Sequence, residues 1–304
     1  MISVCVPVFN VDTRKLARQL ADQAGAVEER VEVLFFDDFS DEKFRKLNRQ
    51  IAEINGVIYR EMEQNYGRAA IRNLMGKSAS CPWLLFLDGD SLIDRPDFLN
   101  NYIQAASSAH VVCGGTIYSP VPPEDKSSLL RWIYGSKREQ LTAGQRTSGN
   151  KFAITANNFL IKKEVFLQHG FRETITGYGH EDTVLGYDLC KAGIPVSQID
   201  NPVIHTGLET SPEYLLKTKK ALDNLWFISR EVITDPQFKQ ESGLLRWRLK
   251  FKRLGVLGLS GKLFRWVEPL FIRNLTGSHP RLLIFDLYRI GYLCQVSRAN
   301  RSDI

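Results

Sequence analysis

Residues 84–90 read Leu-Leu-Phe-Leu-Asp-Gly-Asp, an apolar run that ends in two carboxylates separated by one glycine. The apolar part predicts a buried strand, at whose end Asp88 and Asp90 would both project outward. Two carboxylates beside a diphosphate suit Mg²⁺ or Mn²⁺ better than zinc, and Gly89 would let the backbone approach a phosphate closely. Because Asp-Gly is also common turn chemistry, the stretch alone favours a metal site and a plain turn about equally.

The first 120 residues alternate strand and helix patterns around this stretch, which is typical of an α/β domain with a mainly parallel sheet. Ligands of open α/β sheets bind outside the carboxyl ends of the strands, so Asn10, Asp37, Asp38 and Asp88 should share one rim. The expected strands span residues 4–8, 31–37, 57–62 and 83–87.

A second polar segment, Gly177-Tyr178-Gly179-His180-Glu181-Asp182, precedes an expected helix from about 180 to 192. Acids are favoured electrostatically in the first turn of a helix, which by itself would explain Glu181 and Asp182. It does not explain the two glycines and the aromatic ring, which would suit a saccharide packed on Tyr178 beside a carboxylate base.

Two further local patterns give structural expectations. The polar stretch 144–151 predicts a loop, and Ser211 with Pro212 predicts the cap and first position of a long helix. The five cysteines are widely spaced and lie mostly in apolar runs without a Cys-x-x-Cys pair, which predicts reduced core thiols. No apolar run reaches about 18 residues and no signal peptide is recognisable, so we expect a cytoplasmic protein without a spanning helix.

The net charge of +6 is concentrated in the last part of the chain. Residues 243–304 contain twelve Lys and Arg against three acids, while the first 242 residues are mildly acidic. The basic residues alternate with Leu, Trp and Phe, which predicts a basic amphipathic helical extension on an anionic membrane surface. Nucleic acid, which the same charges could bind, is the rival partner and is not expected. A second alternative is that the segment forms a helical subdomain that packs on the core and has a solvated basic face.

Five motifs, in this order, resemble those of glycosyltransferase family 2 enzymes of the GT-A fold, over roughly residues 1–210. The motifs are the strand 4–10, the segments 37–40 and 65–73, Asp88 to Asp90, and Glu181 with Asp182. The resemblance implies a Rossmann-like mixed sheet flanked by helices. It also implies a GT-A domain at 1–242, with a nucleotide-binding half at 1–120 and an acceptor half at 121–242, before the extension at 243–304.

The resemblance also implies roles for individual residues. Asp182 would be the base that activates the acceptor, with Glu181 in support. Asp38 would contact the nucleotide base, and Arg72 would bind a donor phosphate or hold the metal motif, or else form a structural ion pair. The full expected donor set is Pro7, Phe9, Asn10, Asp38, Asn65, Arg68, Arg72, Asp88 and Gly89. The expected acceptor set is Asn157, Tyr178, Gly179 and His180.

Residues 179–182 are also similar to the acceptor motif of β-1,4-galactosyltransferases, which place a histidine metal ligand a short way downstream. His205 fits that place, so the expected metal ligands are Asp90, Asp88 and His205 for Mn²⁺ or Mg²⁺. One departure from the family is Phe39, where a glycine is common; it suggests a stiffer or differently angled loop.

The resemblance implies an inverting, metal-dependent hexosyl- or N-acetylhexosaminyltransferase with a nucleotide-sugar donor, most simply a UDP-sugar. The pattern Gln-x-x-Arg-Trp of processive members is missing, so we expect a non-processive enzyme. The tail suggests a peripheral protein on the inner face of the cell membrane, acting on a saccharide or lipid-linked saccharide in cell-surface polysaccharide synthesis.

Two alternatives are a sugar-phosphate nucleotidyltransferase and a non-catalytic, membrane-associated protein that binds nucleotide sugars. The first should open with a Gly-rich, Arg-containing loop, yet residues 6–12 contain no glycine. A dinucleotide-dependent oxidoreductase would need Gly-x-Gly-x-x-Gly after the first strand, which this sequence lacks.

Overall fold

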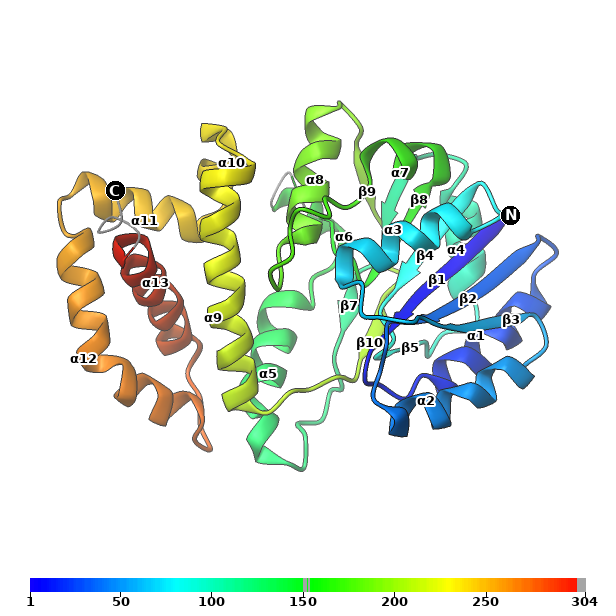
Figure 1. Ribbon diagram of the computed structural model, residues 1–304, viewed down its shortest axis with the longest axis horizontal. Coiled ribbons are helices and arrows are strands. Elements are labelled where there is room, and N and C mark those ends of the chain that lie inside the picture. The colour runs from blue at the N-terminus through cyan, green and yellow to red at the C-terminus, as the bar shows by residue number, and fades with distance from the viewer. Residues whose placement is uncertain (150–151, 153, 300–304) are drawn as a thin grey trace. The chain divides into compact units, whose positions relative to one another are not determined.

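The computed structural model describes residues 1–149, 152 and 154–299. Seven strands form one sheet in the order β3-β2-β1-β4-β8-β6-β9 (Figure 1). Neighbouring strands run parallel except β8, which is antiparallel to both β4 and β6. The expected mixed α/β sheet is therefore confirmed. The strands are β1 (Ile2–Val8), β2 (Val31–Asp37), β3 (Val57–Glu61), β4 (Trp83–Leu87), β6 (Val111–Cys113), β8 (Asn158–Lys162) and β9 (Val196–Gln198).

Helices cover both faces of this sheet, which explains why its central strands β1 and β4 are almost continuously buried. Val4 and Leu85 face α1 (Arg14–Ala26) and α4 (Phe98–Ala105) in one buried cluster. Phe86, from the same strand as Leu85, belongs to the opposite cluster. The helices that contribute to that second cluster are α3 (Arg68–Ser78), α7 (Lys163–His169) and α8 (Glu181–Lys191).

A second sheet of three short strands has the order β5-β10-β7. Strand β5 (Ser91–Leu92) directly follows the Asp-Gly-Asp stretch, and it pairs antiparallel with β10 (Val203–His205). Strand β7 (Thr116–Ile117) lies on the other side of β10 and runs parallel to it. The pairing places His205 opposite Ser91, and so brings the end of β10 to the end of β4.

Two local expectations differ from the structure. Helix α9 (Ser211–Phe227) is capped by Thr210, whose side chain forms a capping box with Glu213, because the Ser211 hydroxyl donates instead to Ser127 O. The expected loop at 144–151 is mostly helix α6 (Ala143–Ser148), which begins with a second capping box. Residues 150 and 151 lie outside the described residues.

The chain divides into two compact units: residues 1–119, 139–176 and 181–207, and residues 120–138, 177–180 and 208–304. The second unit begins its main segment at 208, rather than at the expected boundary of 243, because α9 packs on the C-terminal helices. Its α-helices are α5 (Leu129–Tyr134), α9, α10 (Pro236–Glu241), α11 (Gly243–Arg253), α12 (Leu257–Leu275) and α13 (Leu282–Ala299).

The remaining helical segments are short. They are α2 (Glu42–Asn48), the 3₁₀ segments η1 (Arg49–Glu53) and η2 (Lys126–Ser128), and the π segments η3 (Gly135–Glu139) and η4 (Ile228–Val232). None of the helices in the described ranges is both long and apolar enough to cross a bilayer. All five cysteines are free thiols and all but Cys190 are buried, as their spacing predicts.

Candidate active site

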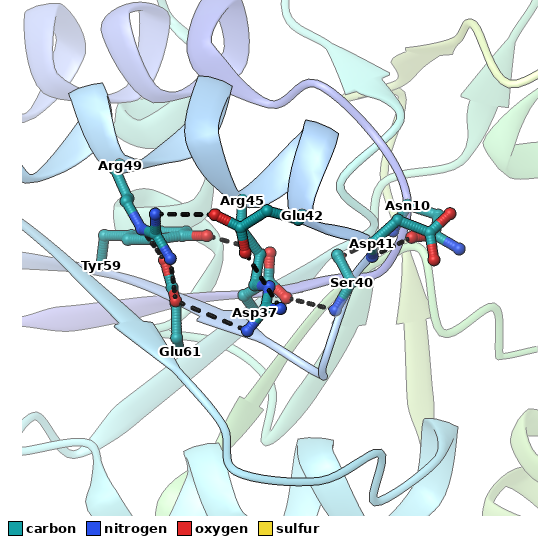
Figure 2. Close-up of polar contacts among 9 residues, drawn as sticks. All are labelled: Asn10, Asp37, Ser40, Asp41, Glu42, Arg45, Arg49, Tyr59 and Glu61. Atoms are coloured by element: carbon teal, nitrogen blue, oxygen red, sulfur yellow. Dashed lines mark hydrogen bonds and ion pairs between the residues drawn. The ribbon is translucent and has the colours of Figure 1, made fainter.

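The loops that follow β1 and β2 are tied together by side chains at the carboxyl ends of the strands (Figure 2). Asp37 accepts hydrogen bonds from Ser40 N at 2.7 Å and from the Tyr59 hydroxyl at 2.9 Å. Asn10 N donates to Ser40 Oγ at 2.8 Å, and Asn10 Oδ1 accepts from Asp41 N at 2.7 Å. Of the residues expected to share one rim, Asn10 and Asp37 therefore lie close together, and Asp37 and Ser40 shape the two loops.

Asp38, the expected contact to the nucleotide base, anchors the turn before α3. Its Oδ1 accepts from Tyr66 N at 2.6 Å, and its Oδ2 accepts from Gly67 N at 2.9 Å. Asn65 completes the turn by donating to Asp38 O at 2.9 Å. Burial raises the pKa of Asp38, and the two backbone N–H groups offset only part of the rise. Each carboxylate oxygen keeps a second lone pair that a bound base could use.

Phe39 occupies the position where the family commonly has glycine, and it adopts a backbone conformation that favours glycine. Its φ is +66°, in the left-handed region, and the side chain is 47% exposed. The guanidinium of Arg45 lies 5.4 Å from the ring centroid. Two more large side chains at this rim, Phe9 and Tyr66, are also exposed. The loop thus keeps the glycine conformation while presenting an aromatic ring.

Arg72, on α3, links the end of β4 to the start of α8. Its Nη2 lies 2.5 Å from Asp88 Oδ1, and its Nη1 lies 4.0 Å from Glu181 Oε1. Arg68 Nη1 approaches the same Glu181 oxygen at 3.5 Å. Arg72 and Glu181 are buried, so these charges interact with little screening. Among the roles expected for Arg72, the geometry shows contact with the Asp-Gly-Asp stretch.

Asp90 lies against the segment that follows β10. Nδ1 of His205 is 3.5 Å from Asp90 Oδ1, while Thr206 donates to Asp90 O through both its N–H, at 2.9 Å, and its hydroxyl, at 2.7 Å. A Cβ added at Gly207 would overlap Asp90 Oδ2. Burial alone would raise the pKa of Asp90, but His205 and then Arg68 outweigh it and hold the pKa below its ordinary value.

Thr206 and Gly207 were not among the expected site residues. They follow His205 directly, and the sequence indicated them only through that adjacency.

The side-chain oxygens of Asp90 and the ring nitrogens of His205 suit a divalent cation that takes its other ligands from a substrate. Asp90 Oδ1 is buried and receives no hydrogen bond in the part of the chain that the structure describes. The same residues contain no group of three His, Cys, Asp or Glu side chains that could hold a metal. The expected set of Asp88, Asp90 and His205 is therefore not assembled as a cage, since Asp88 faces Arg72. Mg²⁺ typically takes one or two carboxylates together with substrate phosphates.

Asp182 is the second residue of α8 and is partly buried. Its Oδ1 accepts a hydrogen bond from Thr183 N at 2.6 Å. Burial, followed by the charge of Glu181, raises the pKa of Asp182 to about 6, while Thr183 and Arg72 oppose the rise. A carboxyl group that titrates near neutral pH is suited to general base catalysis.

The turn 177–180, which contains the expected acceptor contacts, belongs to the second unit and packs on α9. A Cβ at Gly177 would lie 2.6 Å from Asn224 Cγ, and Asn224 Nδ2 donates to Gly179 O at 2.5 Å. Gly179 and His180 both have positive φ, and Lys217 Nζ lies 5.6 Å from the Tyr178 ring centroid. Close packing on α9 thus gives a structural reason for the two glycines. The sequence alone did not indicate this reason.

The remaining expected residues surround the end of β4. Asn157 donates to Thr116 Oγ1 at 2.8 Å, and its carbonyl accepts from Asp88 N at 3.4 Å. Gly89 is packed against the end of β1 and the loop that follows it: a Cβ there would lie 3.2 Å from Pro7 O and 3.0 Å from Thr13 Cγ2. The absence of a side chain at Gly89 therefore lets this segment of the same chain approach the Gly89 backbone closely.

Residues 3–170, more than half of the chain, match the family model described as glycosyl transferase family 2. The chain belongs to glycosyl transferase family 2. Among solved structures, this family 2 chain is similar to the mannosyltransferase PcManGT from Pyrobaculum calidifontis, in complex with GDP-Man and Mn²⁺. The TM-score is 0.61 at 15% identity, over 99% of this chain and 87% of that one.

TarS from S. aureus, residues 1–349 in complex with UDP, gives a TM-score of 0.53 at 16% identity, over 100% of this chain and 92% of that one. At these identities the two likenesses show the fold. Curated relatives of this family 2 chain include a validoxylamine A glucosyltransferase from Streptomyces hygroscopicus subsp. limoneus, 27% identical over 65% of this chain and 49% of the relative. The chain spans about half the length of the curated relatives it matches.

The likeness of residues 179–182 to the acceptor motif of β-1,4-galactosyltransferases finds no support in these matches and stays a prediction.

Proposed function

We propose that this family 2 protein transfers a sugar from a nucleotide-diphosphate sugar to an acceptor hydroxyl, with inversion at the anomeric carbon. The observation that supports it best is the network in which Arg72 pairs with Asp88 and approaches Glu181. The network joins the end of β4, where a donor diphosphate would bind, to the helix that bears Asp182. Phosphate and sugar chemistry would then meet on adjacent elements of one unit.

In the proposed reaction, Asp182 accepts the proton of the acceptor hydroxyl. The hydroxyl oxygen then bonds to the anomeric carbon, and the bond from that carbon to the diphosphate oxygen breaks with its electron pair on the diphosphate. Because the displacement is direct, one base suffices and no covalent sugar intermediate forms. The guanidinium groups of Arg68 and Arg72 add positive charge on the donor side. Asp90, together with Asp88 and His205, would hold Mn²⁺ or Mg²⁺, which would supply positive charge to stabilise the departing diphosphate.

The solved relatives support the donor class, since one is in complex with GDP-Man and Mn²⁺ and the other with UDP. A UDP-sugar is our proposed donor, with a hexosyl or N-acetylhexosaminyl group transferred. We further propose a non-processive enzyme that acts on a saccharide or lipid-linked saccharide in cell-surface polysaccharide synthesis, as a peripheral protein on the inner face of the membrane. The basic, aromatic C-terminal helices support the membrane setting.

The test is a panel of nucleotide sugars, each incubated with Mn²⁺, Mg²⁺ or a chelator, with release of nucleoside diphosphate as the readout. We expect release with one class of donor and loss of release in the chelator. Asp90→Asn should lower kcat by roughly a hundred-fold or more, since metal-bound charge stabilisation amounts to several kcal/mol. Gly207→Ala should also lower kcat, because its methyl group would displace Asp90, whereas Gly144→Ala, at a site with open space, should not.

Two outcomes would favour the alternatives. Saturable donor binding without any release, at high enzyme concentration, would indicate a non-catalytic binding protein. Release of pyrophosphate from a nucleoside triphosphate and a sugar phosphate would indicate a nucleotidyltransferase.

A further inference from the structure

Helix α12 presents a row of large apolar side chains to solvent. The spacing of Leu259, Leu263, Trp266 and Leu270 is four, three and four residues, so all four lie on one face of the helix. Their exposed fractions are 68%, 60%, 85% and 66%. We call these four residues the α12 ridge. A contiguous row of this kind on a surface helix commonly marks a binding surface.

The opposite face of α12 accounts for the packing of the helix. Phe264 and Leu275 are buried there, in a cluster that also contains Phe285 and Tyr288 of α13. A Cβ at Gly291 of α13 would overlap the Phe264 ring, so the two helices are closely packed. The α12 ridge is thus the outward side of a helix whose inward side is already used.

Exposed basic side chains also lie on α12, with Lys262 and Arg273 beside the ridge and Arg265 farther around the helix. Lys262, Arg265 and Arg273 are exposed, and none of them pairs with an acid within the described ranges. The one acid of α12, Glu268, is paired with Lys219 at 2.7 Å. The exposed side of α12 therefore combines apolar groups with uncompensated positive charge.

Helix α11, where the alternation of basic and apolar residues is densest, uses part of that pattern for packing. Arg248 is buried, and its guanidinium lies 4.0 Å from the Trp226 ring centroid. Leu245 is buried as well. In a helix, strict alternation distributes the two residue types around all sides, so it cannot by itself form a lipid-facing stripe. The outward stripe lies on α12 instead.

We propose that the α12 ridge docks on an anionic lipid surface. Trp266 and the leucines would enter the boundary between headgroups and acyl chains, a region that tryptophan favours, and Lys262, Arg265 and Arg273 would contact anionic headgroups. A protein partner would need its own acidic groups to pair with Lys262, Arg265 and Arg273, whereas an anionic lipid surface supplies both the negative charge and the apolar layer. A second copy would bring the same cations together across a two-fold axis. The proposal rests on the membrane setting proposed above and does not depend on glycosyl transfer.

The experiment is flotation of the full chain with vesicles of phosphatidylcholine, with and without phosphatidylglycerol. The wild-type protein should float with the anionic vesicles and should be released by salt. Leu263→Ser/Trp266→Ser/Leu270→Ser should lower partitioning at least about ten-fold, given the apolar area removed. Leu167→Ser, a similarly exposed leucine on α7, is the matched control and should float like wild type.

The charges are tested separately. Lys262→Glu/Arg265→Glu should weaken binding to anionic vesicles by at least roughly 25-fold, since each basic residue near such a surface contributes about five-fold. Lys15→Glu/Arg18→Glu, an exposed basic pair on α1, is the control and should have a much smaller effect. Melting temperatures equal to wild type would show that the variants are folded.

Three outcomes would overturn the proposal. They are no flotation of the wild-type protein, equal flotation with charged and uncharged vesicles, and a wild-type dimer in light scattering that the triple serine variant dissociates. Release of nucleoside diphosphate in vesicle-free solution, measured in parallel, reports on the proposed transfer alone. Failure of either proposal can thus be recognised independently of the other.

Discussion

At the scale of single residues, Asp182 is a carboxylate placed where ionisation is unfavourable. Burial and the neighbouring Glu181 raise its pKa from an ordinary value of 3.8 to about 6. The folded protein therefore binds this proton more tightly than the unfolded chain, and the free energy of unfolding should fall as the pH rises from about 4 to about 6. A residue that only stabilised the first turn of α8 would show the opposite sign.

Asp182→Asn separates these two roles. If Asp182 is the base, the variant should have a kcat between about 100-fold and 10,000-fold lower than wild type, while the Kd for the donor is unchanged. Its melting temperature at pH 7 should be equal to or above that of wild type, because the variant removes a partly buried charge that lies next to the charge of Glu181. In the wild-type protein, the rate of the proposed transfer should decline as the pH falls through about 6. Steady-state kinetics across pH and thermal unfolding measure both effects.

The matched control is Glu164→Gln, an acid in the first turn of α7 that should leave kcat unchanged. Near-normal transfer by Asp182→Asn with intact donor binding would show that another group takes the proton.

Phe39 is a residue whose backbone conformation and side chain have different preferences. A left-handed conformation costs a non-glycine residue about 1–2 kcal/mol. Phe39→Gly should therefore raise the free energy of unfolding by about 1 kcal/mol in denaturant titrations. Phe9→Gly is the control, because Phe9 is similarly exposed but is not among the described residues with positive φ. This change should lower the free energy of unfolding by about 0.5–1 kcal/mol. Equal effects of the two changes would rule out strain at Phe39.

At the scale of elements, α3 joins β4 to α8 through one buried guanidinium. Arg72→Met would leave Asp88 and the buried Glu181 without that partner, so the free energy of unfolding should drop by about 3 kcal/mol or more. Arg49→Met removes an exposed guanidinium that pairs with Glu42 and Glu61, and should cost at most about 1 kcal/mol (Figure 2). Chemical denaturation compares the two variants.

A double variant tests whether the network acts as a unit. Arg72→Met/Asp88→Asn should be less destabilised than the sum of the two single changes, because the second change removes the carboxylate that the first left unpaired. Strict additivity would mean that Arg72 stabilises the fold only through packing.

At the scale of the whole molecule, the C-terminal helices are part of a core and are not an appended tail. The second unit buries Leu130 and Leu215 together with side chains of α12 and α13. Phe285→Ala should lower the free energy of unfolding by about 3–5 kcal/mol, whereas Leu283→Ala, exposed on the same helix, should change it by less than about 0.5 kcal/mol. Removing residues 243–304 would expose this core, so such a truncation does not test membrane contact by itself.

The sequence determined the parts of the site that lie within single segments. The ends of β2 and β4 fall at Asp37 and Leu87 as expected, because apolar runs and the polar residues that end them are local features. The motif order was also sufficient to indicate the family, which the match over residues 3–170 confirms. The roles proposed for individual residues stay predictions.

Only the tertiary structure decided which side chains meet. The contacts of Arg72 with Asp88, Asp90 with Thr206 and Gly207, and Gly177 with Asn224 join segments far apart in sequence, and no local pattern specifies such distances. The same holds for the tail, where composition predicted basic amphipathic helices. The side of each helix that is buried depends on its neighbours. One side of α11 packs on Trp226, and one side of α12 packs on α13. The α12 ridge, which the sequence did not distinguish from the rest of the basic tail, is left facing solvent.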